Sequence, residues 1–504
     1  MSCLSEIGLS RKQRVFVTLE STCGTLQFPN ATTDFIRPAG DAVMNQNPTF
    51  VDSNEKRNTL DVLDRFQNSM PPGTWNIPMY LRLQDKSYAT PQGDNLFYAW
   101  QGDLVTSTAA SNSDDWGSAA PTLIHIEGIT DLDGFPGVGV VYVASAGTNQ
   151  LVHYGVLHQN ENAATASLGD LTMGWDGSTA AEANADAVSP TEVTLVSRFY
   201  NQDTNSPSVT IWIETDHFVQ GMAGCTVNNV SLGINNEGAV TFEFSGEGME
   251  MIWAGEANIS VAATAASSHC VVAAGEGERF TVGSYIYNSS TTPGGASAAS
   301  IGFLISAITA GGGEGGGDLI TFATPITGPR STEFGWEIPA GGWSTPDTIK
   351  GYLPITVNDG ALYPAVDTIG TPIESRLTDV EINDVAAKVK GIDMTFSVPK
   401  VYTTDEVGTD FPADYMENQR EITSTLAVYF TKARAIYFKQ GYDGDEVPVL
   451  LTLGSTQGER MEIYMKKCAL EVPTIGFEQP AVTLSIPLKA LGTYGEDSCD
   501  VVLT

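Results

Sequence analysis

Apolar and polar residues alternate with a period of two along much of the chain. The pattern is clearest over residues 75–83, 240–245, 394–399, 422–430 and 482–489. Such alternation predicts half-buried strands of antiparallel sheets. Pro78, Pro399 and Pro487 fall on polar positions of these strands. Because proline cannot donate to a β-ladder, we expect these strands to be sheet edges or to carry bulges there. Residues 53–66 fit either a short helix capped at Ser53 or a strand and a loop.

Two passages look like copies of one strand–turn–strand unit. In both, a cysteine precedes a glycine by eight residues, and Ala-Val-Thr and a large apolar residue follow. The first runs from Cys225 through Gly233 to Phe242, and the second from Cys468 through Gly476 to Leu484. The second is one residue shorter between the glycine and the alanine, where a turn would absorb the difference. A duplicated unit favours packing and assembly over chemistry, and the alternative is a chance match.

Shifts in composition divide the chain into five parts. Residues 101–204 are rich in small and polar residues, and residues 256–330 read as a separate β-unit with a glycine-rich loop. We therefore predict an N-terminal arm (1–35), a first β-domain (36–100 plus 205–255), an insertion (101–204), a small β insertion or decoration domain (256–330) and a second β-domain (331–504). The fold class is all-β.

The net charge of −35 is concentrated in the middle of the chain, because residues 91–370 hold 4 basic and 30 acidic side chains. Binding to nucleic acid or to anionic membranes needs lysine and arginine, so the charge argues against both. The simpler interpretation is a device for solubility; the sharper one is a surface that nucleic acid must not stick to.

The six cysteines form no CxxC motif or regular framework, which indicates free thiols in a reducing compartment. The first residues lack the basic and apolar regions of a signal peptide, and no apolar run is long enough to span a bilayer.

Candidate chemistry is sparse. GxGxxG occurs within Gly311–Gly316, but without the preceding strand and following helix that a phosphate site needs. Asp131 and Asp133 lack the later ligands of a calcium loop, and neither HExxH nor GxSxG occurs. We therefore expect no enzymatic activity, no catalytic residue, no metal and no cofactor.

Diffuse motifs at both ends resemble one family. They are Thr18-Leu-Glu-Ser-Thr-Cys-Gly-Thr25, Pro72-Gly-Thr-Trp75, Val380–Asp384, Ile392–Phe396, Arg420–Leu426 and Pro487–Gly492. The chain is similar over roughly residues 10–100 and 375–492, and more weakly over 205–250, to the tail tube (major tail) proteins of tailed bacteriophages. Residues 101–200 and 255–330 have no counterpart.

The resemblance implies a duplicated tail-tube β-sandwich or barrel with inserted small β-domains. In that family, sheets join between subunits into rings, and the rings stack into a hollow tube that delivers the genome. Duplication implies three subunits per ring with pseudo-sixfold symmetry. The implied partners are the chain itself and the tape measure, tail terminator and baseplate proteins. DNA would pass an acidic lumen without specific binding. No membrane is bound, and the location is the virion tail, assembled in the host cytoplasm.

Two segments are candidates for contact between rings. The loop Thr403–Asn418 carries Asp405, Asp410, Phe411, Asp414 and Tyr415, and the N-terminal arm carries Arg11 and Arg14. The alternative for the loop is an exposed hairpin connection without a partner. The alternative functions are another virion β-protein, namely a baseplate hub ring or a receptor-binding adhesin, and a secreted carbohydrate-active β-protein.

Overall fold

The structure is a computed structural model. It describes residues 13–30, 33–53, 55, 64–83, 91–105, 108–111, 124–127, 139–145, 149–154, 156–159, 165–169, 190–195, 198–235, 238–264, 266–290, 302–323, 334–335, 342–353, 370–383, 385–404, 407–455, 460–478, 481–492 and 497–503. Strands dominate these residues, which confirms the all-β fold class.

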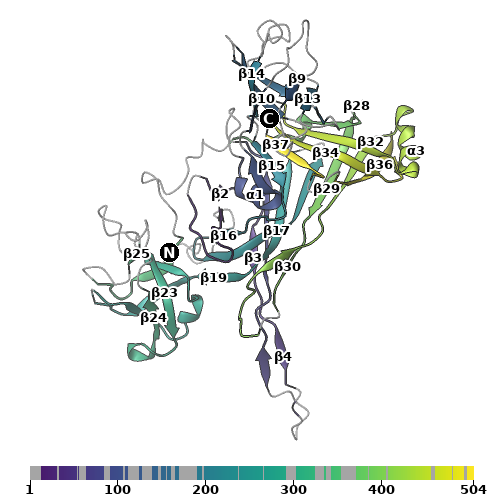
Figure 1. The fold of residues 1–504 in the computed structure, drawn as a ribbon. Helices are drawn as coiled ribbons and strands as arrows, with labels where there is room; N and C mark the ends of the chain where they lie inside the picture. The colour runs from purple at the N-terminus through teal and green to yellow at the C-terminus, as the bar shows by residue number, and fades with distance from the viewer. Residues whose placement is uncertain are drawn as a thin grey trace.

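Eight strands form one continuous antiparallel ladder, which we call the long sheet (Figure 1). Alternate residues along it are buried, as the sequence pattern predicted. Its order is β3 (Val43–Asn45), β6 (Gly73–Tyr80), β18 (Thr241–Gly248), the C-terminal half of β17 (Val219–Asn235), β29 (Val389–Ser397), β32 (Glu421–Tyr429), β36 (Ala481–Ala490) and β35 (Thr474–Glu478).

Further strands form two groups, and most of these strands bury apolar side chains in the same core as the long sheet. One group is β2 (Phe35–Ile36), β1 (Arg14–Leu19), β16 (Val209–Glu214), the N-terminal half of β17 and β19 (Glu250–Ala254). The other is β28 (Val385–Ala386), β27 (Thr378–Ile382), β33 (Glu446–Leu453), β34 (Met461–Leu470), β37 (Asp500–Leu503), β15 (Arg198–Gln202) and β7 (Gly102–Val105).

Helix α1 (Asp94–Gln101) is part of this core. The ring of Phe97 is fully buried, with centroids 5.2–5.6 Å from those of Phe244, Phe242 and Tyr200. Burial of one such ring stabilises the fold by roughly 1.5–3 kcal/mol.

Two of the three prolines lie at irregularities in the ladder rather than at edges, and Pro399 lies just after β29, outside the strands. Pro78 lies where the pairing of β3 with β6 changes register, between the pair Val43–Asn76 and the bridge Pro38–Met79. Pro487 lies opposite the break between β34 and β35, because the neighbouring pairs are Leu470–Leu488 and Thr474–Ser485. Both positions agree with the bulge alternative of the prediction.

One succession of elements occurs twice in the chain. The first is β1, β3, β6, α1, β16, β17 and β18, and the second is β27, β29, β32, α3 (Ile436–Asp443), β33, β34 and β36. In the first, Gly233 pairs with Thr241, whose hydroxyl donates to the glycine carbonyl at 3.2 Å. In the second, Gly476 pairs with Thr483, and the same bond measures 3.4 Å.

Other registers of the two repeats also correspond. Val209 pairs with Cys225 and Val447 with Cys468, and in both ladders the register shifts immediately after that valine. Tyr80 faces Thr241, as Tyr429 faces Thr483. These registers agree with the predicted duplication and extend it to seven elements.

Hairpins occupy the same place in both repeats. The hairpin of β4 (Phe50–Asp52) and β5 (Arg65–Gln67) lies between β3 and β6, and that of β30 (Lys400–Tyr402) and β31 (Tyr415–Glu417) lies between β29 and β32. Within residues 53–66, Arg65 and Phe66 are therefore in a strand, and residues 54 and 56–63, on which the helix alternative falls, lie outside the described residues.

The insertions form separate sheets. Residues 108–195 contribute β8 (Thr108–Ser111), β9 (Ile124–Glu127), β10 (Gly139–Ser145), β11 (Asn149–Tyr154), β12 (Val156–Gln159), β13 (Thr165–Gly169) and β14 (Pro190–Leu195) in two sheets. A seven-stranded sheet contains β20 (Glu256–Val261), β21 (His269–Val272), β22 (Tyr285–Asn288), β23 (Gly302–Thr309), β24 (Asp318–Phe322), β25 (Phe334–Gly335) and β26 (Thr348–Gly351).

Three predicted boundaries differ from this architecture. β1 lies in the predicted N-terminal arm, yet Val15, Phe16 and Val17 are buried in its ladder with β16. β7 and β15 lie in the predicted 101–204 insertion, yet they pair with each other and β15 pairs with the C-terminal strand β37. β26 lies in the predicted second β-domain, yet it pairs with β20 and β22 of the small sheet.

Candidate assembly surfaces

The β4–β5 hairpin projects from the body of the molecule, away from the end that carries β9, β10 and β14 (Figure 1). All six of its strand residues are exposed, including Phe50, Val51 and Phe66. The guanidinium of Arg65 lies 3.3 Å from Asp52 and 5.0 Å from the centre of the Phe50 ring. A projecting, apolar two-stranded hairpin is a candidate docking element. Sequence analysis did not select it, because Phe50 and Val51 form only a two-residue apolar run and Phe66 stands alone between Arg65 and Gln67.

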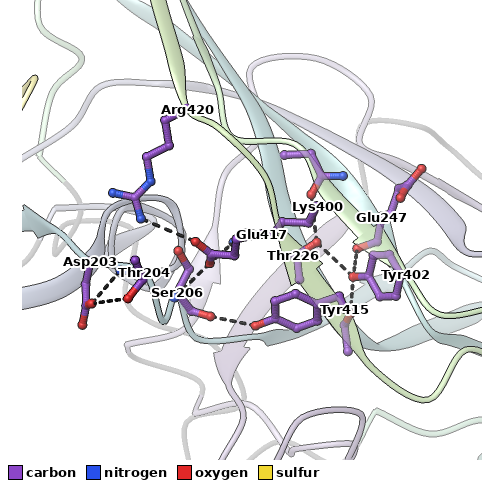
Figure 2. Close-up of polar contacts among 12 residues, drawn as sticks. Asp203, Thr204, Ser206, Thr226, Glu247, Lys400, Tyr402, Tyr415, Glu417 and Arg420 are labelled. Atoms are coloured by element: carbon purple, nitrogen blue, oxygen red, sulfur yellow. Dashed lines mark hydrogen bonds and ion pairs between the residues drawn. The ribbon is translucent and has the colours of Figure 1, made fainter. Parts of the chain in front are cut away.

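The other hairpin is fixed to the body at its base (Figure 2). Tyr415 donates its hydroxyl proton to the carbonyl of Ser206 at 2.7 Å. The hydroxyl of Tyr402 lies 2.7 Å from the carbonyl of Gly224 and 2.9 Å from the hydroxyl of Thr226. Since Ser206 precedes β16 and Gly224 lies in β17, these two tyrosines attach the hairpin of the second repeat to the first repeat.

A charged cluster accompanies the two tyrosines. The side chain of Lys400 is fully buried, and its Nζ lies 3.4 Å from Oε1 of Glu417. The same Glu417 oxygen accepts the backbone N–H of Ser206 at 3.1 Å, and Arg420 lies 3.6 Å from the other oxygen (Figure 2). Burial lowers the pKa of Lys400 to about 8; Glu417 opposes this shift and Arg420 adds to it.

This lowered pKa predicts how stability depends on pH. Between pH 8 and the ordinary lysine value of 10.5, the folded protein binds fewer protons at Lys400 than the unfolded chain does. Stability therefore rises with pH in this window, by about 3 kcal/mol. We expect Lys400→Met to abolish that rise, measured as urea unfolding of the variant and the wild type from pH 7 to 10.5. Lys489→Met, at a half-exposed site, is the control; parallel profiles for wild type and Lys400→Met would contradict the prediction.

The predicted inter-ring residues fall into three groups. Arg11 and Asp405 lie outside the described residues. Arg14 and Tyr415 make contacts within the chain, Arg14 in an ion pair with Glu214 across the β1–β16 ladder.

The remaining three, Asp410, Phe411 and Asp414, lie in the β30–β31 connection. Asp410 and Asp414 are exposed and Phe411 is half-buried. The carbonyl of Asp410 accepts the N–H of Met70 at 2.8 Å, and Ser69 donates to the carbonyl of Thr404 at 3.2 Å. These bonds bring the connection alongside the segment that joins the β4–β5 hairpin to β6.

The two outermost strands of the long sheet also expose apolar side chains. Within the described residues, β3 pairs only with β6, and β35 only with β36. Val43 on β3 is 55 % exposed, and Ile475 and Phe477 on β35 are 44 % and 83 % exposed. Unpaired strand edges with apolar side chains are templates for pairing with another chain.

The glycine-rich passage has a structural role instead of a phosphate site. The carboxylate of Asp318 accepts the backbone N–H groups of Gly275, Gly277 and Gly311 at 2.8–3.0 Å. These bonds hold the pKa of Asp318 below its ordinary value, and the bond from Gly311 has the largest effect. The passage is thus arranged around an acidic side chain of the protein itself.

The described part of the chain has few side chains arranged for metal binding or nucleophilic catalysis. It holds no group of three or more His, Cys, Asp and Glu side chains that could bind a metal. Of its free cysteines, Cys23 is exposed, and burial raises the pKa of Cys270 and Cys468 to about 12. No helix in these residues has the length and apolar content to cross a membrane. No protein-family model matches the chain, and no curated protein matches it either.

Proposed function

We propose that the chain is a structural subunit of a bacteriophage tail tube, with three chains per ring and stacked rings forming a conduit for the genome. The observation that carries this proposal is the β17–β29 ladder, in which seven residue pairs join the two repeats edge to edge. A sheet that already continues from one repeat to the next can continue from chain to chain, and closure into a ring removes its free edges.

The exposed face of the long sheet suits the wall of such a conduit. Its residues are mostly small and polar, and its exposed acidic side chains include Glu243, Asp393 and Glu421. Of the described acidic residues between 91 and 370, only Glu243 and Glu247 lie on this sheet, and others, such as Glu276, lie in the small domain. The proposed acidic lumen therefore depends on a few wall residues and not on the acidic middle of the chain. Carboxylates on this wall would repel phosphates and let DNA pass.

The projecting β4–β5 hairpin supports stacking. It extends away from the sheets and exposes apolar side chains, so it is positioned to reach a neighbouring ring (Figure 1). In this proposal the β30–β31 connection, with Asp410, Phe411 and Asp414, supports the base of that hairpin. The further partners would be tape measure, tail terminator and baseplate proteins in the virion tail.

Electron microscopy of the purified protein, with mass from light scattering, tests the proposal. We expect rings or hollow tubes with three chains and six repeats per layer. Six chains per layer would keep the tube but remove the role of the duplication. A discrete oligomer that never stacks would instead favour a baseplate hub ring or a receptor-binding adhesin.

A further inference from the structure

We infer that β35 of one chain pairs with β3 of the next, in the antiparallel register that β17 and β29 have within the chain. This joint rests on the proposed ring. In the second repeat, β34 and β35 together correspond to β17 of the first repeat, and β35 matches its C-terminal half. In the same way, β3 of the first repeat corresponds to β29 of the second. The chain therefore contains one joint already made and the two halves of a second joint at its free edges.

The register of β17 with β29 within the chain predicts the register of β35 with β3 between chains. Within the chain, Ser231 pairs with Thr395, Leu232 with Met394 and Gly233 with Asp393. The matching pairs Gly233–Thr241 and Gly476–Thr483 align the two repeats. The three β17 residues therefore correspond to Thr474, Ile475 and Gly476. Asn45, Met44 and Val43 are the equivalents of the three β29 residues, through the corresponding β3–β6 and β29–β32 registers. The new joint thus pairs Thr474 with Asn45, Ile475 with Met44 and Gly476 with Val43.

Burial agrees with this assignment. Leu232 and Ile234, in the internal joint, are 1 % and 4 % exposed. Their equivalents Ile475 and Phe477 are 44 % and 83 % exposed in the single chain. Pairing with β3 would cover Ile475 with Met44 and Phe477 with the surface around Ala42. Apolar side chains that are buried at one joint and exposed at the equivalent position indicate a missing neighbour.

The helices give a second, independent indication. Both α1 and α3 have eight residues and end at a glycine, Gly102 and Gly444. Trp100, two residues before Gly102, is 2 % exposed, and its ring centroid lies 4.7 Å from that of Phe396 across the internal joint. Tyr442 is the equivalent of Trp100 and is 84 % exposed. The equivalent of Phe396 is Gln46, directly after β3, so this segment of the next chain beside β35 would cover Tyr442.

A disulfide between chains tests the register. Asn45 and Thr474 are both exposed and lie at opposite edges of the long sheet, so Asn45→Cys and Thr474→Cys cannot cross-link within one chain. Directly opposite residues of an antiparallel pair have Cα atoms about 4.5–5.5 Å apart, which suits a disulfide. After mild oxidation of the double variant, we expect covalent dimers and closed trimers on a non-reducing denaturing gel. Each single variant should stay monomeric there.

Controls separate the register from mere proximity. Asn45→Cys with Ile475→Cys moves one thiol to the opposite face of the sheet, so the covalent ladder should be lost. Rings seen by electron microscopy without the Asn45–Thr474 cross-link would overturn this joint and leave the proposed tube intact. Cross-linked open chains that never close would keep the joint and overturn the three-chain ring. The absence of both rings and cross-links would overturn both proposals.

Discussion

Phe477→Asp is expected to abolish ring assembly while leaving the single chain folded. In the single chain the Phe477 side chain is 83 % exposed, so the substitution should change the free energy of unfolding by less than about 0.5 kcal/mol. In the proposed joint the same side chain is buried, so the variant loses its apolar burial and places a carboxylate there. We expect each joint to weaken by about 3 kcal/mol, or roughly 100-fold in association. Light scattering should then report monomers at concentrations where the wild type forms rings.

Phe66→Asp is the matched control, because Phe66 is another exposed phenylalanine, 57 % exposed, but lies on the projecting hairpin. It should leave rings intact and prevent their stacking into tubes. Both variants should melt at the wild-type temperature. Normal rings from Phe477→Asp, or loss of rings from Phe66→Asp, would show that the joint has been placed on the wrong edge.

The sequence predicted the repeated strands well because their pattern is local. Alternation of apolar and polar residues reports which face of a strand is buried, and the Cys–Gly–Ala-Val-Thr spacing marked the same turn in both repeats. The full repeat of seven elements could be recognised only from the strand registers. Partners such as Val209 and Cys225 lie side by side in the sheet, and the sequence alone does not show which residues pair.

The candidate contact residues were harder to predict. Tyr415 was selected because it lies in a long loop, yet its hydroxyl is bonded to Ser206, more than two hundred residues away in sequence. The β4–β5 hairpin was missed because its two strands are short and exposed, so no buried face is repeated along them. Exposure of Phe477 is likewise a tertiary property: its sequence neighbourhood reads like that of the buried Ile234.

Glu20→Ala is expected to destabilise the first repeat strongly. The two carboxylate oxygens of Glu20 accept four hydrogen bonds at 2.7–2.8 Å, from the N–H groups of Gly24 and Gly224 and the hydroxyls of Ser208 and Thr210. The residue thereby joins the turn after β1 to β16 and to the irregular point of β17, where Gly224 has a φ of 63°. Glu20 and Gly24 belong to the N-terminal motif Thr18–Thr25, and the hydrogen bond between them gives their four-residue spacing a structural explanation.

Truncation to alanine leaves four partly buried donors without an acceptor, and hydrogen bonds to charged groups contribute about 1.5–3 kcal/mol each without adding fully. We expect Glu20→Ala to lower the free energy of unfolding by about 3–5 kcal/mol in urea titrations, and Glu20→Gln by about half as much, because the amide keeps one acceptor oxygen. Ser21→Ala, next in sequence and exposed, should stay within about 0.5 kcal/mol of wild type. A Glu20→Ala variant as stable as Ser21→Ala would mean that water replaces the carboxylate and that the turn, β16 and β17 hold together without it.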